Sequence, residues 1–157
     1  MYTLGPISGS KAEKGPTTGK PFLCPFNCPK AVSSDDVDTL GTKAQQELNT
    51  QLTQQLKTEL QGKKATLIGT PGFGDVNGSS NPAVGATSDT VTVTVTESAT
   101  ARYISNADAQ KVAGDLLQQM VDANHTLMQT QTGMPIVKSV TAQGVATIQI
   151  AAAGVVR

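Results

Sequence analysis

The most regular pattern in the chain is an alternation of valine and threonine over residues 90–96. The apolar positions are Val91, Val93 and Val95, and the polar positions are Thr90, Thr92, Thr94 and Thr96. Because successive side chains of a strand point to opposite faces, this alternation predicts a strand with one buried and one polar face. We expect the strand to span residues 90–104, with a bend or bulge near Glu97 that turns its carboxylate outward.

A long polar helix is predicted from Ser33 to Gln61. Its apolar positions are Val37, Leu40, Ala44, Leu48, Leu52, Leu56 and Leu60. Ser33 or Ser34 supplies the N-cap, and Gly62 is the kind of residue that follows the last turn of a helix.

The leucines of this helix are four residues apart, and each step of four rotates about 40° around an α-helix. The leucine stripe therefore winds around the helix, and one flat sheet cannot cover all of it. Either the helix breaks at Gly41, with a second N-cap at Thr42, or its N-terminal half packs on something other than its own sheet. The second alternative makes Leu48 and Leu52 candidate interface residues.

A second helix is predicted after the cap residues 105–108, with an apolar stripe that faces one surface. Its apolar positions are Ala109, Val112, Ala113, Leu116, Leu117, Met120 and Val121. We expect this helix to be the core element, with Leu116, Leu117 and Met120 packed against the valines of residues 91–95.

The remaining predicted elements are shorter. Residues 65–70 form a short strand, followed by a Gly/Asn/Ser loop to about residue 88 that we interpret as a flexible connector. Two further strands, at residues 136–141 and 145–152, are joined by a tight turn over residues 142–144.

The order of these elements predicts an α+β fold with an internal repeat, because helix, strand and strand occur in residues 34–104 and again in residues 106–152. We expect an (αββ)2 two-layer sandwich, with a mainly antiparallel four-stranded sheet and two helices on one face. Residues 33–157 form this single domain. Residues 1–32 are rich in glycine and proline, and we expect an extended N-terminal arm. The threonines of residues 90–96 line the open face of the sheet and are candidate interface residues.

The composition excludes several partners. The chain has 157 residues, with 12 Lys+Arg and 12 Asp+Glu, so its formal net charge is zero. Such a chain offers no positive field to nucleic acid or to an anionic membrane surface. Its apolar stretches fall far short of the roughly 20 residues that a membrane helix needs. We expect neither a nucleic-acid partner nor membrane insertion.

Cys24 and Cys28 are the two cysteines of the chain, and both are flanked by proline. We predict a disulfide between them, which is the chemistry of an oxidising compartment. The alternatives are free structural thiols and a zinc site. A zinc site needs two further ligands, and the single histidine, His125, lies far along the chain.

The sequence holds no motif that specifies a catalytic chemistry. The surroundings of His125 supply neither an orienting acid nor a nucleophile in a local pattern, and we interpret it as an exposed loop histidine. The glycine-rich residues 69–78 lack the last glycine of the dinucleotide fingerprint and the lysine of a phosphate loop. Glu97 is the one carboxylate that breaks an apolar pattern. We predict no catalytic residue, no cofactor and no metal site.

The order of elements also resembles a known family. The residues concerned are the glutamine-rich helix of residues 44–61, the segment Leu67-Ile68-Gly69-Thr70-Pro71, the strand of residues 90–96 running into Ala99-Thr100-Ala101-Arg102-Tyr103, and the helix of residues 108–119. Together they resemble a segment of bacterial surface proteins of the phage baseplate J-like family, over roughly residues 33–157. The resemblance implies a structural role without catalytic residues, in a domain of a larger secreted or envelope protein.

We therefore expect a non-enzymatic structural or assembly module that binds itself or another protein subunit, as a homo-oligomer or a filament. Strand addition at an exposed sheet edge is one mode that this pattern favours. Its expected location is extracellular, at the cell surface or on a virion. The alternative is an extracellular module that binds a glycan or a peptide on the polar sheet face or under residues 72–88. A hydrolase that uses His125 is the third hypothesis.

Overall fold

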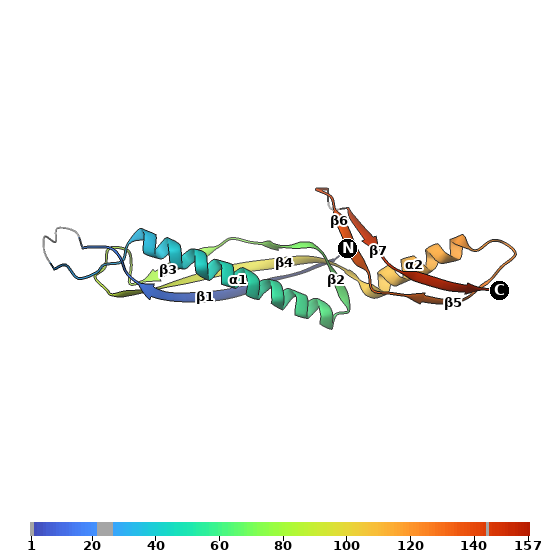
Figure 1. The fold of residues 1–157 in the computed structure, drawn as a ribbon, viewed down its shortest axis with the longest axis horizontal. Coiled ribbons are helices and arrows are strands. Elements are labelled where there is room, and N and C mark those ends of the chain that lie inside the picture. Colours follow the sequence, from blue (N-terminus) through green and yellow to red (C-terminus); the bar gives the residue numbers. More distant parts are fainter. Residues whose placement is uncertain (1, 22–26, 144) are drawn as a thin grey trace. The chain divides into compact units, whose positions relative to one another are not determined.

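The computed structural model describes residues 2–21, 27–143 and 145–157, and within them the chain forms two helices and eight strands (Figure 1). The helices are α1 (Ser34–Gly62) and α2 (Asn106–Met120). The strands are β1 (Tyr2–Pro16), β2 (Ala65–Phe73), β3 (Asn77–Asn81), β4 (Thr90–Ser105), β5 (Leu127–Thr132), β6 (Ile136–Val140), β7 (Ala146–Gln149) and β8 (Ala152–Val156).

The predicted α+β class is confirmed, with two helices and a mainly antiparallel four-stranded sheet. The order within that sheet is β1-β4-β2, and β3 pairs with β4 in addition. The strands after α2 form two separate antiparallel pairs, β5 with β8 and β6 with β7. The repeat interpretation drew the four strands from both halves of the chain. Instead, all four strands of this sheet precede α2, because β1, and not a strand of the second half of the chain, pairs with β4.

Strand β1 lies where we expected an extended arm. The expectation for residues 1–32 was therefore wrong for residues 2–16, which are paired in the sheet. Glycine and proline disfavour a central strand, but β1 is an edge strand and tolerates both. Gly9 also has a packing role, because a Cβ atom there would lie 2.9 Å from Leu48 Cδ1 and 2.9 Å from Leu52 Cδ2.

The chain divides into two compact units. The unit that we call the helix–sheet unit comprises Pro6–Gln54 and Gly72–Thr100. The other, which we call the C-terminal unit, comprises Met1–Gly5, Gln55–Pro71 and Ala101–Arg157.

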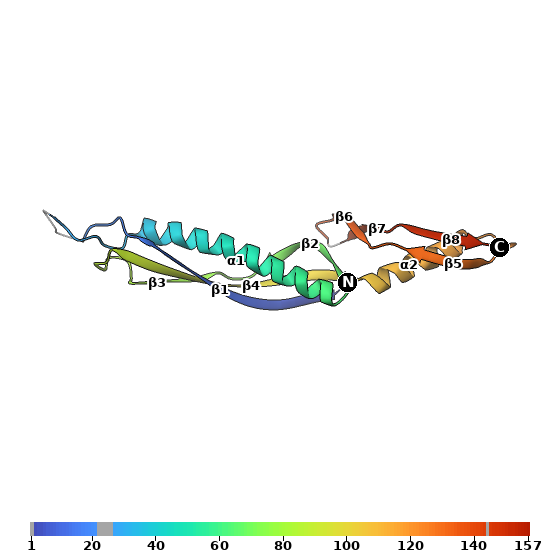
Figure 2. The same cartoon turned by 60° about the horizontal axis from the view of Figure 1, so that its bottom comes forward.

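The core of the helix–sheet unit is aliphatic and lies between α1 and the sheet. In this unit α1 runs along β1 and β4 in both views (Figure 1, Figure 2). The helix is close to both strands, because a Cβ atom on Gly15 would meet Leu40 and one on Gly41 would meet Val93. The buried apolar side chains of the unit are Ala31, Val32, Ala44, Leu48, Leu52, Val91, Val93, Val95 and Ala99.

Helix α1 is continuous through Gly41, so the predicted break at that residue does not occur. Leu48 and Leu52 are fully buried inside the chain, next to Gly9 of β1. The expectation that they form an interface is corrected accordingly. A leucine stripe that winds around a helix fits a sheet because strands twist in a right-handed sense and the sheet surface turns with them.

The first turn of α1 is held by a reciprocal cap. Ser33 N–H donates to Asp36 Oδ2 at 3.0 Å, and Asp36 N–H donates to Ser33 Oγ at 3.1 Å. Thr18 adds its N–H to Asp36 Oδ2 at 2.9 Å and its hydroxyl to Asp36 Oδ1 at 2.6 Å. These hydrogen bonds hold the pKa of Asp36 far below its usual range, and the bond from the Thr18 hydroxyl has the largest effect. Ser33 is therefore the N-cap, and the Asp36 carboxylate links Thr18 to the first turn of α1 through two hydrogen bonds.

Strand β4 confirms the predicted strand but lacks the expected outward turn. Its residues alternate between buried and more exposed positions from Thr90 to Ala101 without interruption. Glu97 therefore stays on the apolar face and is only 4% exposed. The prediction that a bulge turns Glu97 outward was wrong, because the neighbouring pairing holds the strand regular through this position.

The part of the C-terminal unit that follows β4 has few buried side chains. Helix α2 packs against the pair β5 and β8, and Ala109 and Ala113 are its buried apolar residues. Leu116 is 55% exposed and Met120 is 81% exposed. The expected core role of the Leu116, Leu117 and Met120 row was therefore wrong. The two short strands beside α2 cover only the alanine side of its wide apolar stripe.

The predicted C-terminal hairpin is confirmed as the pair β6 and β7. Ile136 lies opposite Gln149, and Val137 lies opposite Ile148. Thr141 closes the connection, since its N–H donates to the carbonyl of Val145 at 2.8 Å.

Candidate functional site

The predicted polar face of β4 exists. Thr90 and Thr96 are exposed and Thr92 and Thr94 are half-buried, on the face opposite the buried valines. Strand β3 extends this face, because Asn77 lies opposite Thr96 and Ser79 opposite Thr94. The Thr96 hydroxyl donates to the carbonyl of Asn77 at 3.4 Å. The face offers hydroxyl and amide groups, but its role as an interface stays a prediction.

A groove lies on the other side of the sheet, between α1 and β3. Its floor is Val93 and Val95, and its volume is about 440 Å³. The groove is open because the residues of β3 that face these valines, Ser80 and Gly78, are too small to fill the space beside Gly41 of α1. Hydrogen-bonding side chains on its walls are Asp38, Thr42, Gln45 and Ser80. An apolar floor with polar walls suits an extended peptide.

Glu97 is an unusual buried group. Its Oε2 atom and Asn49 Oδ1 are buried without a hydrogen-bond partner among the described residues. Burial raises the pKa of the Glu97 carboxyl, because an apolar surrounding disfavours its charged form. Burial therefore shifts the protonation equilibrium of Glu97 toward the neutral acid.

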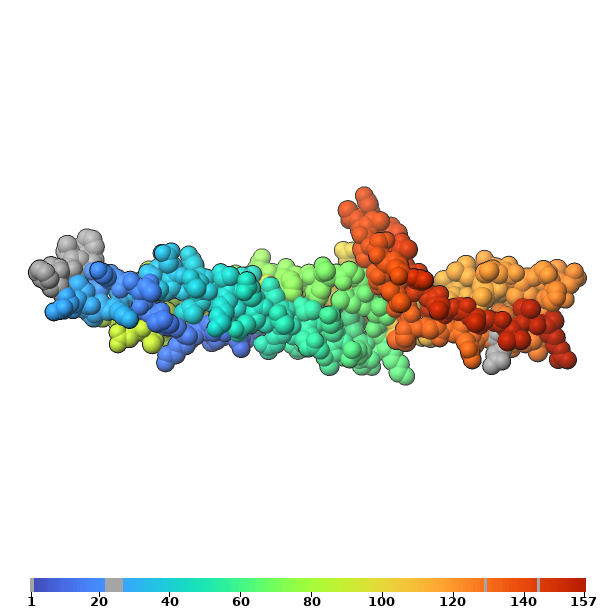
Figure 3. Space-filling view, viewed as in Figure 1, coloured from blue at the N-terminus to red at the C-terminus, as the bar shows by residue number. Residues whose placement is uncertain are grey.

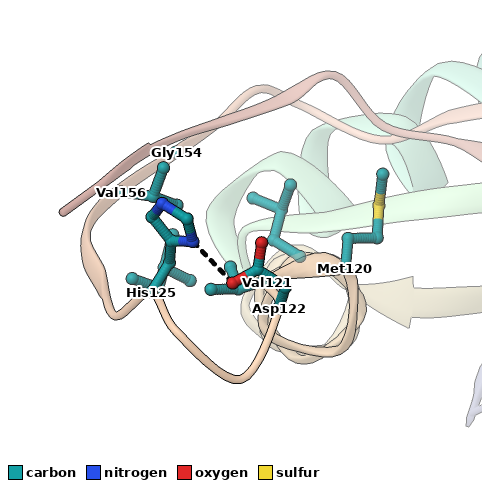
Figure 4. A pocket seen from close by; sticks show the side chains of 8 residues that line it. Met120, Val121, Asp122, His125, Gly154 and Val156 are labelled. Atoms are coloured by element: carbon teal, nitrogen blue, oxygen red, sulfur yellow. Dashed lines mark hydrogen bonds and ion pairs between the residues drawn. The ribbon is translucent and has the colours of Figure 1, made fainter.

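A second cavity lies in the C-terminal unit, between α2 and the strands β5 and β8 (Figure 4). Its volume is about 270 Å³. The lining residues are Leu117, Met120, Val121, Asp122, His125, Leu127, Gly154 and Val156. It is mostly apolar, and its polar side chains are those of Asp122 and His125.

Asp122 and His125 form a hydrogen-bonded pair in the turn after α2. Asp122 Oδ1 lies 2.5 Å from Nδ1 of His125, and it also accepts the N–H of Asn124 at 2.9 Å. Figure 4 shows the carboxylate and the ring side by side. The pair supplies the orienting acid that the sequence pattern did not reveal, but none of the residues that line the cavity is a serine, threonine or cysteine. The arrangement therefore holds the turn and lacks a nucleophile among its lining residues.

The remaining predicted sites are settled only in part. Cys24 lies outside the described residues, so the disulfide between Cys24 and Cys28 stays a prediction. Residues 77–81 of the expected flexible connector form β3. Among the described residues no three His, Cys, Asp or Glu side chains gather in a way that could hold a metal ion.

The C-terminal unit exposes many large apolar side chains. Between residue 112 of α2 and the end of β8, the exposed large apolar side chains are Val112, Leu116, Met120, Met128, Met134, Ile136, Val140, Val145, Val155 and Val156. Figure 3 shows the surfaces of α2 and β8 side by side. Val112, Leu116 and Met120 are spaced by four residues along α2 and form the row that we call the α2 apolar row.

The sequence pattern missed two features that bear on function. One is the Asp122 and His125 pair, for which an aspartate three residues before the histidine in a turn was the available signal. The other is strand β1, whose inward positions Gly9, Lys11 and Glu13 follow the period of a strand but are not apolar.

Neither helix in the described part of the chain is long and apolar enough to cross a bilayer. In comparisons with known proteins, the chain matches no family model, no curated protein and no solved structure.

Proposed function

We propose that the chain is a non-enzymatic structural or assembly module that acts through association with itself or with another protein subunit. The observation that carries this proposal is the exposure of large apolar side chains in the C-terminal unit, above all the α2 apolar row. Soluble monomers rarely leave contiguous apolar patches open, and such patches mark interaction sites. The described cavities add no catalytic set that would favour an enzyme.

The resemblance to the baseplate J-like family supports the same role. It suggests a module of an extracytoplasmic or phage-tail-like assembly, located outside the cell, at its surface or on a virion. The polar threonine face and the zero net charge of the chain are compatible with a protein partner rather than a nucleic acid.

The test is the mass of the protein in solution, measured by size-exclusion chromatography with light scattering over a wide range of concentrations. We expect the mass to rise above that of one chain. The variant Leu116→Ser with Met120→Ser should shift this rise to higher concentrations, because it removes exposed apolar area without touching a buried residue. Gln119→Ser, an exposed polar position of the same helix, is the control. A chain that stays monomeric at all concentrations would argue against self-association.

The groove on Val93 and Val95 favours a second candidate, an extracellular ligand-binding module for a peptide or a glycan. Few aromatic side chains are present, at 3% of the sequence, so stacking on sugar rings has little to build on and a peptide fits better. Binding of an extended peptide library to wild type, compared with a Gly41→Leu variant that fills the groove, tests this candidate. Equal binding by both would remove it.

A further inference from the structure

The outer edge of β1 is a long free sheet edge. β1 has 15 residues and stands at the end of the order β1-β4-β2, and no other described strand pairs with its outer side. From Ile7 to Pro16 its residues alternate regularly between half-buried and exposed. A regular edge strand presents a row of unpaired N–H and C=O groups on which another strand can pair.

The backbone groups that point to this edge follow from one hydrogen bond. Thr17, directly after β1, donates its N–H to the carbonyl of Asp89, directly before β4, at 3.0 Å. Backbone N–H and C=O groups alternate in direction along a strand. The backbone groups of the odd-numbered residues therefore point toward β4, and those of the even-numbered residues point toward the free edge. Pro6 and Pro16 are both even-numbered, as expected for prolines in an edge strand. Between the two prolines, the residues whose backbone N–H and C=O groups point to the free edge are Ser8, Ser10, Ala12 and Lys14.

The inner face of β1 carries two opposite charges that are paired with α1. Lys11 Nζ lies 3.5 Å from Glu47 Oε2, and Lys43 Nζ lies 3.5 Å from Glu13 Oε2. Position 12 of β1 is therefore level with position 45 of α1, midway between both pairs. A two-fold axis through this level would exchange positive for negative charge on both the strand and the helix.

Resting on the proposed function, we infer that a second copy of this chain pairs antiparallel with the outer edge of β1, about a two-fold axis at Ala12. In this register Lys11 of each copy lies opposite Glu13 of the other. An axis at position 11 or position 13 would instead place Lys11 opposite Lys11 or Glu13 opposite Glu13, and like charges directly opposite each other are destabilising. Among the axes at positions 11, 12 and 13, charge therefore favours the register centred on Ala12.

The helices fit the same arrangement. In the register centred on Ala12, Lys43 of one copy is level with Glu47 of the second copy. Strands are spaced by about 4.8 Å, and α1 lies over both β1 and β4, so the two copies of α1 would run about 10 Å apart. Helices pack at about 8–10 Å, which makes this spacing one at which the paired charges can meet.

Cysteine cross-linking tests the register. Ala12 lies opposite itself, with Cα atoms about 5.5 Å apart in a hydrogen-bonded antiparallel pair, which is within the range of a disulfide. We expect the Ala12→Cys variant to form a covalent dimer on oxidation. Ser10→Cys is the matched control, because position 10 lies opposite Lys14 and not opposite itself. Wild type oxidised in parallel accounts for Cys24 and Cys28.

A proline variant tests the hydrogen bonds. Ala12→Pro removes the N–H at the axis, and because Ala12 pairs with its own copy, two intermolecular hydrogen bonds are lost at once. We expect association to weaken by about tenfold or more. Circular dichroism should show an unchanged fold, since this N–H points away from β4, and Ala12→Ser keeps the N–H and should associate as wild type does.

The outcomes separate this inference from the proposed function. A chain that associates equally well with Ala12→Pro, and that cross-links through position 10 as readily as through position 12, overturns pairing at β1 while self-association stands. A chain that stays monomeric at all concentrations overturns both pairing at β1 and the self-association on which it rests. Selective cross-linking at position 12, with weaker association of Ala12→Pro, supports both.

Discussion

Two buried carboxyl groups of the helix–sheet unit have opposite surroundings. Asp36 accepts hydrogen bonds from Thr18 and Ser33, and these bonds favour its charged form. Glu97 has an Oε2 atom without a hydrogen-bond partner in the described part of the chain, and burial favours its neutral form. The cost of burying a carboxylate therefore depends on its donors rather than on its depth.

The stability of the folded chain should fall with rising pH because of Glu97. Its pKa is raised in the folded state, so the unfolded chain releases this proton at a lower pH than the folded chain does. The contribution is complete below the ordinary range of a glutamate pKa and is lost as pH rises through the raised folded value. Glu97→Gln should be more stable than wild type at neutral pH, and the difference should vanish on acidification.

Urea unfolding of both proteins at several pH values measures this effect. Glu59→Gln, a more exposed glutamate position, is the control and should follow wild type at each pH. A Glu97→Gln variant whose advantage does not change between acidic and neutral pH would show that the pKa of Glu97 is the same in the folded and the unfolded chain.

At the scale of elements, the contact between β1 and α1 depends on Gly9. A methyl group at this position would come within 2.9 Å of two leucine side chains that are fully buried. We expect Gly9→Ala to lower the free energy of unfolding by about 1–3 kcal/mol, the usual cost of adding volume to a packed core. Denaturant unfolding measures it, with Ser10→Ala on the exposed face as the control. Equal stability of both variants would mean that the leucines move aside freely.

The elements that the sequence predicted best are those whose side-chain period coincides with burial. The alternation in residues 90–96 gave β4, and the capped leucine repeat gave α1. Strand β1 could not be found in this way, because its inward positions after Ile7 are glycines and charged residues that lie against α1. Strand β3 was missed because the segment Asn77–Asn81 has no apolar residue and gains its structure from pairing with β4.

The candidate surfaces were predicted less well than the fold. The open threonine face followed from the period of β4. We expected Leu48 at an interface and Leu116 in the core, and the structure shows the opposite burial. An apolar stripe indicates that a helix has a face to bury, but not which element covers that face. Leu48 is covered by β1, a strand that the pattern did not reveal, whereas the short strands beside α2 leave Leu116 open.

At the scale of the whole molecule, the two units should differ in local stability. The helix–sheet unit buries leucines and valines completely, whereas every residue of β8 is exposed. Backbone amides under few buried contacts open at lower free energy. We expect hydrogen exchange in dilute protein to be slower in residues 91–99 than in residues 152–156, measured by mass spectrometry or NMR. Equal protection of both segments would indicate that the chain opens only as one body.

The spacing of Pro6 and Pro16 has a consequence for how far an assembly could grow. Neither proline can contribute an N–H to a neighbouring chain, so the accessible stretch is closed at both ends. A shifted register would place a proline inside the paired segment, and hydrogen bonds between the two chains would be lost there. In the proposed pair, the two proline rings therefore limit the number of hydrogen bonds between the chains and disfavour a shifted register, which keeps the paired segment short.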